Sequence, residues 1–432
     1  MGKRKLYIET YGCQMNFADS EVVAAILSPE YDIVDNVKDA DVILVNTCSI
    51  RDNAEQRVFN RLNELTNLKN KKKHLQIGIL GCMAERLKDD LFQKSNIDLI
   101  VGPDAYRMLP EILKSEISPI DVQLSQTETY KEIIPFKYEG NGVSAFVSIM
   151  RGCNNFCSYC VVPYTRGRER SREIDSILNE IQHLVNDGYK EVTLLGQNVN
   201  SYHFEDYNFA TLMQIVAEKF PTTRIRFATS HPKDLSDELL EVMAKYNNIC
   251  KSIHLPAQSG STAMLKRMNR KYSREDYLNR IASIKKYLPD CAISTDLIAG
   301  FCDETEEEHQ ATLSLMKEVG FDFAYMFKYS MREGTAAHKH MQDNIPEEIK
   351  IKRLEEIIAL QQELSHISNK KDVGKSMEVL VEGPSKRNKN QYFGRNSQNK
   401  VVIFDKGNCQ KGDFVMVKIT ACTAATLLGE LL

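Results

Sequence analysis

Residues 151–160 read RGCNNFCSYC and place three cysteines, Cys153, Cys157 and Cys160, in one short loop. The loop follows an apolar run at residues 145–150, AFVSIM, which predicts a β-strand. Structural zinc sites and most iron-sulfur clusters take four protein ligands, and this loop supplies only three. The loop therefore favours a 4Fe-4S cluster with one open iron. A zinc site completed from elsewhere in the chain is the alternative.

On both sides of this loop, apolar runs alternate with helical patterns over residues 140–370. Each run is followed by a helical pattern until the last, after which a long helix is predicted at about 346–370. This rhythm predicts an incomplete (β/α)6 barrel, whose chemistry belongs at the carboxyl ends of its strands. The predicted strands are AFVSIMRG (145–152), EVTLLGQ (191–197), RIRFATS (224–230), KSIHLP (251–256), CAISTDLIAG (291–300) and FDFAYMFKYS (321–330).

Residues 1–135 predict a separate α/β domain with a largely parallel sheet, joined to the barrel by a polar linker at about 124–142. The predicted strands are KLYIET (5–10), DVILVN (41–46), LQIGIL (75–80) and IDLIVG (97–102), and helical segments are predicted at 49–67 and 105–114.

Cys13, Cys48 and Cys82 each come just after one of these strands. One such cysteine would more often be a buried apolar residue. Because the carboxyl ends of parallel strands meet at one edge of a sheet, we expect the three together to form a second ligand set. The other five cysteines show no such pattern.

Residues 371–432 change character and predict a small all-β barrel or sandwich, with strands at 376–383, 400–405 and 413–421. Residues 369–432 hold eleven Lys and Arg against six Asp and Glu, whereas the whole chain has a net charge of -3. Arg387, Phe393 and Arg395 lie in a basic segment with interleaved aromatic residues, as in small barrels that bind RNA. A solvated basic face is the alternative.

A second basic strip follows the cysteine loop, where Arg166 and Arg168 are candidate RNA contacts together with Arg170 and Arg172. Salt bridges to Glu169 and Glu173 are the alternative. No run approaches the roughly 18 apolar residues of a spanning helix. We therefore expect a soluble, cytoplasmic protein with no membrane contact, whose cysteines stay reduced.

Several motifs now carry a resemblance to the tRNA methylthiotransferases of the radical S-adenosylmethionine superfamily. The chain is similar to the branch that acts on N6-isopentenyl-adenosine, and residues 14–16 and 49–52 favour this branch over its sisters. It departs from the pattern at Cys302 and Asp303, where relatives often have Pro-Gly. The motifs are YGCQMN (11–16), NTCSIRDNAEQ (46–56), GILGCMAER (78–86), residues 150–172, LLGQNVNSY (194–202), HLPAQSGS (254–261) and MREGT (331–335).

The resemblance implies methylthiolation of C2 of N6-isopentenyl-adenosine at position 37 of tRNA. One S-adenosylmethionine would supply the methyl group, and reductive cleavage of a second would start radical sulfur insertion. It implies two 4Fe-4S clusters, one on each cysteine set, and a TRAM-like RNA-binding domain at residues 371–432.

The partners expected are the tRNA anticodon stem-loop and an electron donor such as flavodoxin or ferredoxin, with the enzyme a monomer. A sister methylthiotransferase or a non-catalytic metal-bearing RNA-binding protein is the alternative. No general acid or base is assigned, although His231 and His254 are considered as proton carriers. The polar groups at the barrel strand ends are candidates for binding S-adenosylmethionine: Tyr159, Gln197, Asn198, Ser230, Asp296 and Arg332.

Overall fold

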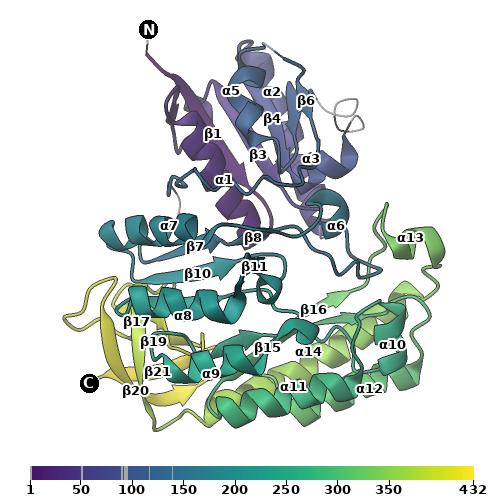
Figure 1. Ribbon diagram of the computed structural model, residues 1–432, viewed down its shortest axis with the longest axis vertical. Helices are drawn as coiled ribbons and strands as arrows, with labels where there is room; N and C mark the ends of the chain where they lie inside the picture. The colour runs from purple at the N-terminus through teal and green to yellow at the C-terminus, as the bar shows by residue number, and fades with distance from the viewer. Residues whose placement is uncertain (1, 50–51, 89–90, 92–95, 116, 139) are drawn as a thin grey trace.

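The computed structural model describes residues 2–49, 52–88, 91, 96–115, 117–138 and 140–432, without the side chains of residues 52–55. Ile50 and Arg51 of the NTCSIRDNAEQ motif lie outside the described residues. The chain forms three units, with the N-terminal α/β unit above the central unit and the C-terminal β unit at its lower left (Figure 1). This agrees with the predicted fold class.

The N-terminal unit is built on a parallel sheet in the order β2-β1-β3-β4-β5-β6. Its central strand β3 is buried along its whole length because helices cover both faces of the sheet. The short edge strands β2 and β6 were not predicted. The strands are β1 (Arg4–Thr10), β2 (Tyr31–Ile33), β3 (Val42–Thr47), β4 (Gln76–Gly81), β5 (Leu99–Val101) and β6 (Ile120–Asp121), and the helices are α1 (Gln14–Leu27), α2 (Asp52–Lys71), α3 (Cys82–Leu87) and α5 (Leu109–Leu113).

The central unit contains the six expected strands, all parallel, as two three-stranded sheets. A bridge between Ile225 and Ile249 joins the sheets, which gives the order β7-β10-β13-β14-β15-β16. Residues on β15 alternate between buried and partly exposed because one face of the strand lines the inside of the open barrel. The strands are β7 (Ser144–Ser148), β10 (Glu191–Leu195), β13 (Arg224–Phe227), β14 (Ser252–His254), β15 (Ala292–Ala299) and β16 (Phe323–Lys328).

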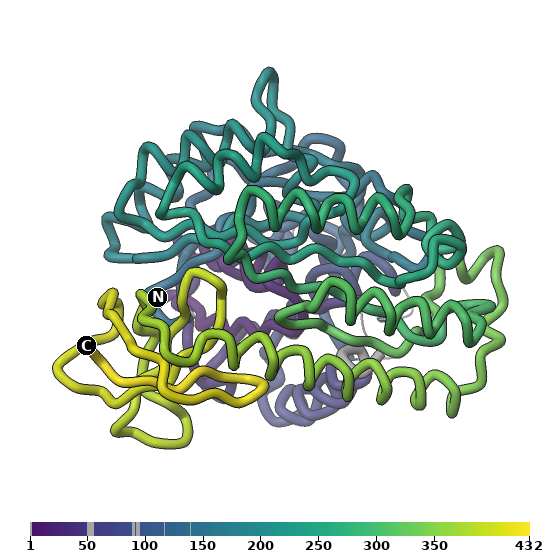
Figure 2. The backbone as a smooth tube through the Cα atoms, turned by 90° about the horizontal axis from the view of Figure 1, so that it is seen from below, coloured from purple at the N-terminus to yellow at the C-terminus, as the bar shows by residue number. Residues whose placement is uncertain are grey.

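Helices follow the barrel strands and pack around them, and α14 runs along one side of the unit toward the C-terminal barrel (Figure 2). Two short antiparallel pairs, β8 (Met150–Arg151) with β9 (Arg170–Ser171) and β11 (His203–Phe204) with β12 (Tyr207–Asn208), flank the strand ends. The helices are α6 (Val162–Thr165), α7 (Ile174–Asn186), α8 (Phe209–Lys219), α9 (Asp237–Lys245), α10 (Thr262–Arg267), α11 (Arg274–Tyr287), α12 (Glu306–Val319), α13 (Ala336–His340) and α14 (Glu347–Lys370).

The C-terminal unit is a closed barrel in the order β17-β18-β19-β21-β20. Its small core includes Val379, Val402, Phe404 and Val417. Closure removes the exposed strand edges that a five-stranded sheet would otherwise present. The strands are β17 (Ser376–Pro384), β18 (Gln391–Arg395), β19 (Val401–Asp405), β20 (Phe414–Cys422) and β21 (Leu427–Leu431).

The N-terminal unit packs on the carboxyl ends of the barrel strands. Met15 and Ala18 of α1 form a small apolar cluster with Leu195 at the end of β10 and with Phe146 of β7. The carboxyl edge of the N-terminal sheet, where α1 begins, therefore faces the carboxyl edge of the barrel. Among the described residues, every helix is too short or too polar to cross a membrane.

Candidate functional site

The central cysteine loop begins where β8 ends and is shaped by Gly152. This glycine has φ +79°, and a Cβ there would lie 2.0 Å from the carbonyl oxygen of Arg168. Only glycine allows the chain to turn so tightly at this point. Cys153 and Cys157 are buried, and the Cys160 backbone N–H donates to the Cys157 carbonyl at 2.9 Å. The structure thus places the three predicted cysteines in one turn at the mouth of the barrel.

A second segment, residues 267–270, holds this loop in place. Asn269 donates to the Phe156 carbonyl at 2.8 Å, and the Ser158 backbone N–H donates to the Met268 carbonyl at 3.0 Å. The Arg270 guanidinium, which is 5% exposed, donates from Nη1 to Cys157 Sγ at 3.2 Å and from Nη2 to the Pro256 carbonyl at 3.0 Å. Arg270 therefore supplies a positive charge and an N–H group beside a sulfur atom.

The chemistry of this donor set fits a thiolate-ligated cluster. Burial raises the pKa of Cys153 to about 11 and that of Cys160 to about 12. Thiolates in such a site are stabilised by bound iron, and metal binding releases their protons. The three sulfur atoms and the guanidinium form the charge arrangement expected around a cluster.

At two neighbouring strand ends, three buried side-chain oxygens make no hydrogen bond to any described residue: Gln197 Oε1, Asn198 Oδ1 and Ser230 Oγ. Asn198 and Ser230 are 1% and 4% exposed. Since buried polar groups are nearly always bonded, unsatisfied groups that converge at a barrel mouth are typical of a ligand site. These three predicted cofactor contacts lie after β10 and β13, beside the cysteine loop.

The other predicted cofactor contacts are more dispersed. The Tyr159 ring packs edge-on against Phe301, with centroids 6.4 Å apart. Asp296 lies on the inner face of β15, where its Oδ1 is 3.4 Å from His254 Nε2. Arg332 follows β16 and is buried, and its carbonyl accepts a hydrogen bond from the Thr335 hydroxyl at 2.7 Å. All three lie in the central unit, with Tyr159 in the cysteine loop and Arg332 beyond the carboxyl end of its strand.

The N-terminal cysteines also gather at one place. The backbone at Gly12 has φ +134°, and a Cβ there would lie 2.5 Å from Cys48 Cβ. A hydrogen bond from Cys48 lowers the pKa of Cys13 to about 6. Cys82 is buried at the start of α3, and burial raises its pKa. The sheet thus brings together three residues that are far apart in sequence, as the strand-end argument predicted.

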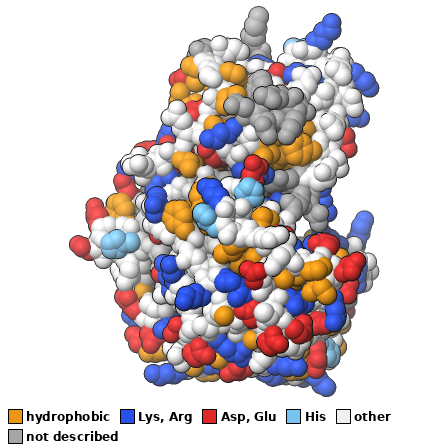
Figure 3. Space-filling view, turned by 90° about the vertical axis from the view of Figure 1, so that its right-hand side faces the viewer, with side chains coloured by type: hydrophobic (Ala, Val, Ile, Leu, Met, Phe, Trp, Pro, Cys, Tyr) orange, Lys and Arg blue, Asp and Glu red, His pale blue; other side chains and the backbone are white. Residues whose placement is uncertain are grey.

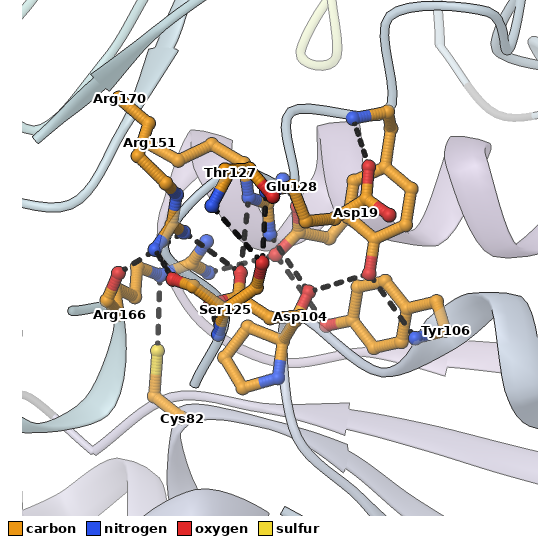
Figure 4. A network of polar contacts seen from close by, with 12 residues as sticks. Asp19, Cys82, Asp104, Tyr106, Ser125, Thr127, Glu128, Arg151, Arg166 and Arg170 are labelled. Atoms are coloured by element: carbon orange, nitrogen blue, oxygen red, sulfur yellow. Dashed lines mark hydrogen bonds and ion pairs between the residues drawn. The ribbon is translucent and has the colours of Figure 1, made fainter. Parts of the chain in front are cut away.

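Arg166 joins this N-terminal site from the central unit (Figure 4). Its Nε donates to Cys82 Sγ at 3.1 Å, and its Nη2 lies 2.9 Å from Asp19 Oδ2. The residue is 3% exposed. Such burial against protein groups speaks against the predicted RNA contact for Arg166.

The remaining arginines of the strip divide between the interior and the surface. Arg170 pairs with Asp104 and Arg172 with Glu180, so salt bridges do form, but not to the acids expected from sequence. Arg168 is exposed, and its guanidinium carbon lies 4.6 Å from the centroid of the Phe156 ring. Arg168 therefore stays a candidate RNA contact.

In the C-terminal barrel, Arg387 is exposed, Phe393 is half-buried on β18, and Arg395 pairs with Glu382 at 3.1 Å. The nearby Lys400 forms an ion pair with Asp372 at 2.7 Å. Figure 3 shows a different part of the surface, the right-hand side of Figure 1, where acidic and basic side chains intermingle on the lower half. Mixed charge on that side of the molecule gives less attraction for phosphates than a basic stripe would.

Among the described residues, no three His, Cys, Asp or Glu side chains are arranged to hold one metal ion. In a 4Fe-4S cluster each thiolate binds its own iron, so the three sulfur atoms surround the cluster and do not converge on one point.

Comparison with known proteins identifies the family. Family profiles match for uncharacterized protein family UPF0004 at residues 5–102, the Radical SAM superfamily at 147–316 and the TRAM domain at 370–432. A tRNA-2-methylthio-N(6)-dimethylallyladenosine synthase of Bacteroides thetaiotaomicron is 59% identical over 99% of this chain and 96% of its own. The protein of the same name from Porphyromonas gingivalis W83 is 56% identical over 99% and 95%.

The chain belongs to the tRNA-2-methylthio-N(6)-dimethylallyladenosine synthase family. It is a radical S-adenosylmethionine enzyme. Among solved structures, the radical S-adenosylmethionine methyltransferase TsrM of Kitasatospora setae is similar, with TM-score 0.57, 12% identity and coverage of 75% of this chain and 73% of TsrM. The cobalamin-dependent enzyme OxsB aligns with TM-score 0.55 and 13% identity over 80% of this chain and 58% of its own. At such identities these likenesses show the fold alone.

Sequence reasoning missed Arg270, which touches Cys157, and Asp19, which pairs with Arg166. Neither belongs to a spaced motif. Asp19 is a single acid in a helix and Arg270 a single arginine after α10, and the sequence does not indicate which residues they contact.

Proposed function

We propose that this enzyme adds a methylthio group to C2 of N6-isopentenyl-adenosine at position 37 of tRNA. The observation that carries the proposal is the pair of three-cysteine sites at facing domain edges, in a chain that spans 95–96% of relatives named for this modification. A reaction that both cleaves S-adenosylmethionine and delivers sulfur needs two thiol-rich sites close to one barrel mouth.

Each set of three cysteines would hold one cluster. In the central loop, Cys153, Cys157 and Cys160 would bind a 4Fe-4S cluster, and in the N-terminal unit Cys13, Cys48 and Cys82 would bind a second. When bound, the two clusters would supply reductive cleavage of S-adenosylmethionine and the sulfur to be transferred. The acid and base groups of a protein cannot break an aromatic C–H bond. The protein therefore contributes binding and orientation of the reactants.

The residues proposed to bind S-adenosylmethionine are those at the strand ends. The amide oxygens of Gln197 and Asn198 would accept hydrogen bonds from its N–H and O–H groups, and the Ser230 hydroxyl could also donate one. The Tyr159 backbone and the side chains of Asp296 and Arg332 are further candidates. Asp296 lies on β15, and Gln197, Asn198 and Ser230 closely follow β10 and β13, so strands of the barrel would fix the cofactor position.

The protein would bind the tRNA at its anticodon stem-loop. Arg168 beside the cysteine loop and Arg387, Phe393 and Arg395 in the C-terminal barrel are the proposed contacts, with cations for phosphates and an aromatic ring for a base. We further propose that a flavodoxin or ferredoxin supplies electrons, that the enzyme acts as a monomer, and that it works in the cytoplasm, where its tRNA substrate is found.

The test is nucleoside mass spectrometry of tRNA from a strain that lacks the gene, complemented with wild-type, Cys48→Ala or Cys157→Ala protein. We expect the 2-methylthio form of N6-isopentenyl-adenosine only with the wild-type chain. Ribosomal proteins from the same strains are analysed by mass spectrometry in parallel. A methylthio group on threonylcarbamoyl-adenosine or on a ribosomal protein would replace this substrate with that of a sister enzyme. Activity of both cysteine variants would refute the proposed role of the two sites.

A further inference from the structure

Arg166 is shared between the two cysteine sites. It lies six residues after Cys160 and caps the one-turn helix α6, with its backbone N–H bonded to the Val162 carbonyl at 2.8 Å. Its side chain leaves the central unit and reaches Cys82 Sγ at 3.1 Å and Asn16 Oδ1 at 3.3 Å. One short turn of chain therefore connects the loop of the first site to a cysteine of the second.

The network around Arg166 contains more positive than negative charge. Arg151 lies 2.8 Å from Asp19 and 3.6 Å from Asp104, and Arg170 lies 2.9 Å from Asp104 (Figure 4). Together with the Arg166 to Asp19 contact, three buried guanidinium groups face two buried carboxylates. A buried charge without compensation is costly, so the excess positive charge calls for a negative partner.

Among the described residues, the acidic side chains near this network are already paired with other cations. Glu128, which Figure 4 also labels, is matched by Arg107. Arg172 is matched by Glu180, and Lys137 is matched by Glu21. Glu85 has Lys88 at 3.8 Å. The thiol groups that Arg166 touches or approaches are the remaining candidates, and a four-iron cluster on three thiolates carries a net negative charge.

We propose that Arg166 is a positioning residue for the N-terminal cysteine site, where it orients Cys82, compensates the charge of the bound cluster and links that cluster to the cysteine loop of the barrel. This inference rests on the proposed function, in which Cys13, Cys48 and Cys82 hold a cluster. An N–H donor and a positive charge at a ligand sulfur stabilise the reduced, more negative cluster. Arg166 therefore raises the reduction potential of this cluster.

The experiment uses the full-length chain with Cys157→Ala, so that only the N-terminal site is expected to hold a cluster of about four irons. Arg166→Gln and Arg166→Lys are added separately to this parent. Arg280→Gln is the matched control, because Arg280 forms a surface pair with Asp237. After anaerobic reconstitution, each protein is measured for iron content, for midpoint potential and for the rate of iron loss to a chelator.

We expect the midpoint potential to be lower in the Arg166→Lys protein than in the parent and lowest in the Arg166→Gln protein, with faster iron loss in both variants. Arg280→Gln should match the parent. If Arg166→Gln does not fold, the comparison of Arg166→Lys with the parent decides, since lysine keeps the charge but loses the paired N–H contacts.

Two failures are distinguishable. A parent that binds iron, with variants of unchanged potential and unchanged iron loss, overturns the role of Arg166 and leaves the proposed function standing. A parent that folds but binds no iron at the N-terminal site overturns the proposed second cluster, and the inference about Arg166 with it.

Discussion

Arg226 on β13 donates from Nη2 to the backbone carbonyl of Asn396 in the C-terminal barrel, over 2.7 Å. Its Nε also donates to Glu191 on β10 at 2.8 Å, and both side chains are buried. Arg224, the first residue of β13, also donates to the C-terminal barrel, at the Arg395 carbonyl over 2.8 Å. Glu191 is likewise the first residue of β10, whereas the cysteine loop lies at the carboxyl side of the barrel strands. The C-terminal barrel is therefore anchored at the end of the central unit away from the cysteine loop.

Replacing Arg226 by Ala should destabilise the protein by about 3 kcal/mol, because it leaves Glu191 buried without its partner. Arg280→Ala, at the surface pair with Asp237, should cost below about 1 kcal/mol. Guanidinium denaturation of both variants measures the difference. Equal midpoints for Arg226→Ala and wild-type protein would show that this contact does not hold the barrel in place.

Arg387→Gln should weaken tRNA binding and reduce the salt dependence of the affinity by about one unit of slope, as loss of one phosphate contact does. Arg387 is exposed, so folding should be unaffected. Affinity measured at several salt concentrations, with Lys317→Gln on α12 as the control, tests this. An unchanged slope would remove Arg387 from the RNA surface. A point variant is preferable to deletion of residues 371–432, because deletion would uncover the buried Arg226.

Cys157→Ala and Cys48→Ala should separate two half-reactions. Cys157→Ala should abolish formation of 5′-deoxyadenosine, because two thiolates in that loop cannot hold a stable cluster. Cys48→Ala should still form 5′-deoxyadenosine but give no methylthio product. Wild-type protein should bind about eight irons, and each variant about four. Methylthiolated tRNA from a folded Cys48→Ala protein would make the N-terminal cysteines structural.

Most of the strands, and the gathering of the cysteines in two groups, were predictable because their signals are local. A buried parallel strand is a short apolar run, and a cysteine at its end needs only the topology of a sheet to find its neighbours. The strands that were missed lack this signal. β18 is interrupted by Gly394, whose Cβ would lie 2.0 Å from the Leu380 carbonyl, so the glycine is required by packing and not by a turn.

The role of Arg166 was not predictable, because its acidic partner Asp19 lies in another domain. Alternating arginines in a basic strip are typical of an exposed segment, and only the folded structure shows which of them point inward.

The structure also explains how the chain accommodates its departure from the family pattern at Cys302 and Asp303. Asp303 takes φ +60°, and Asn344 donates to its carboxylate at 2.6 Å, so an aspartate occupies a left-handed position that glycine would adopt without strain.

His231 should make stability depend on pH. Burial, followed by the nearby Arg270 charge, lowers the pKa of His231 to about 2, against 6.5 for an unperturbed histidine. Below pH 6.5 the unfolded chain therefore binds a proton that the native protein does not, so stability is complete above that pH and is lost as pH falls. At pH 5 the free energy of unfolding is about 2 kcal/mol lower than at pH 8 because of this histidine.

The test measures the free energy of unfolding at pH 8 and at pH 5. His231→Gln should remove the contribution of His231 from the difference between the two values, whereas His203→Gln, on the exposed β11–β12 hairpin, should leave the difference unchanged. The same pH difference in the His231→Gln and wild-type proteins would mean that His231 accepts its proton in the folded state.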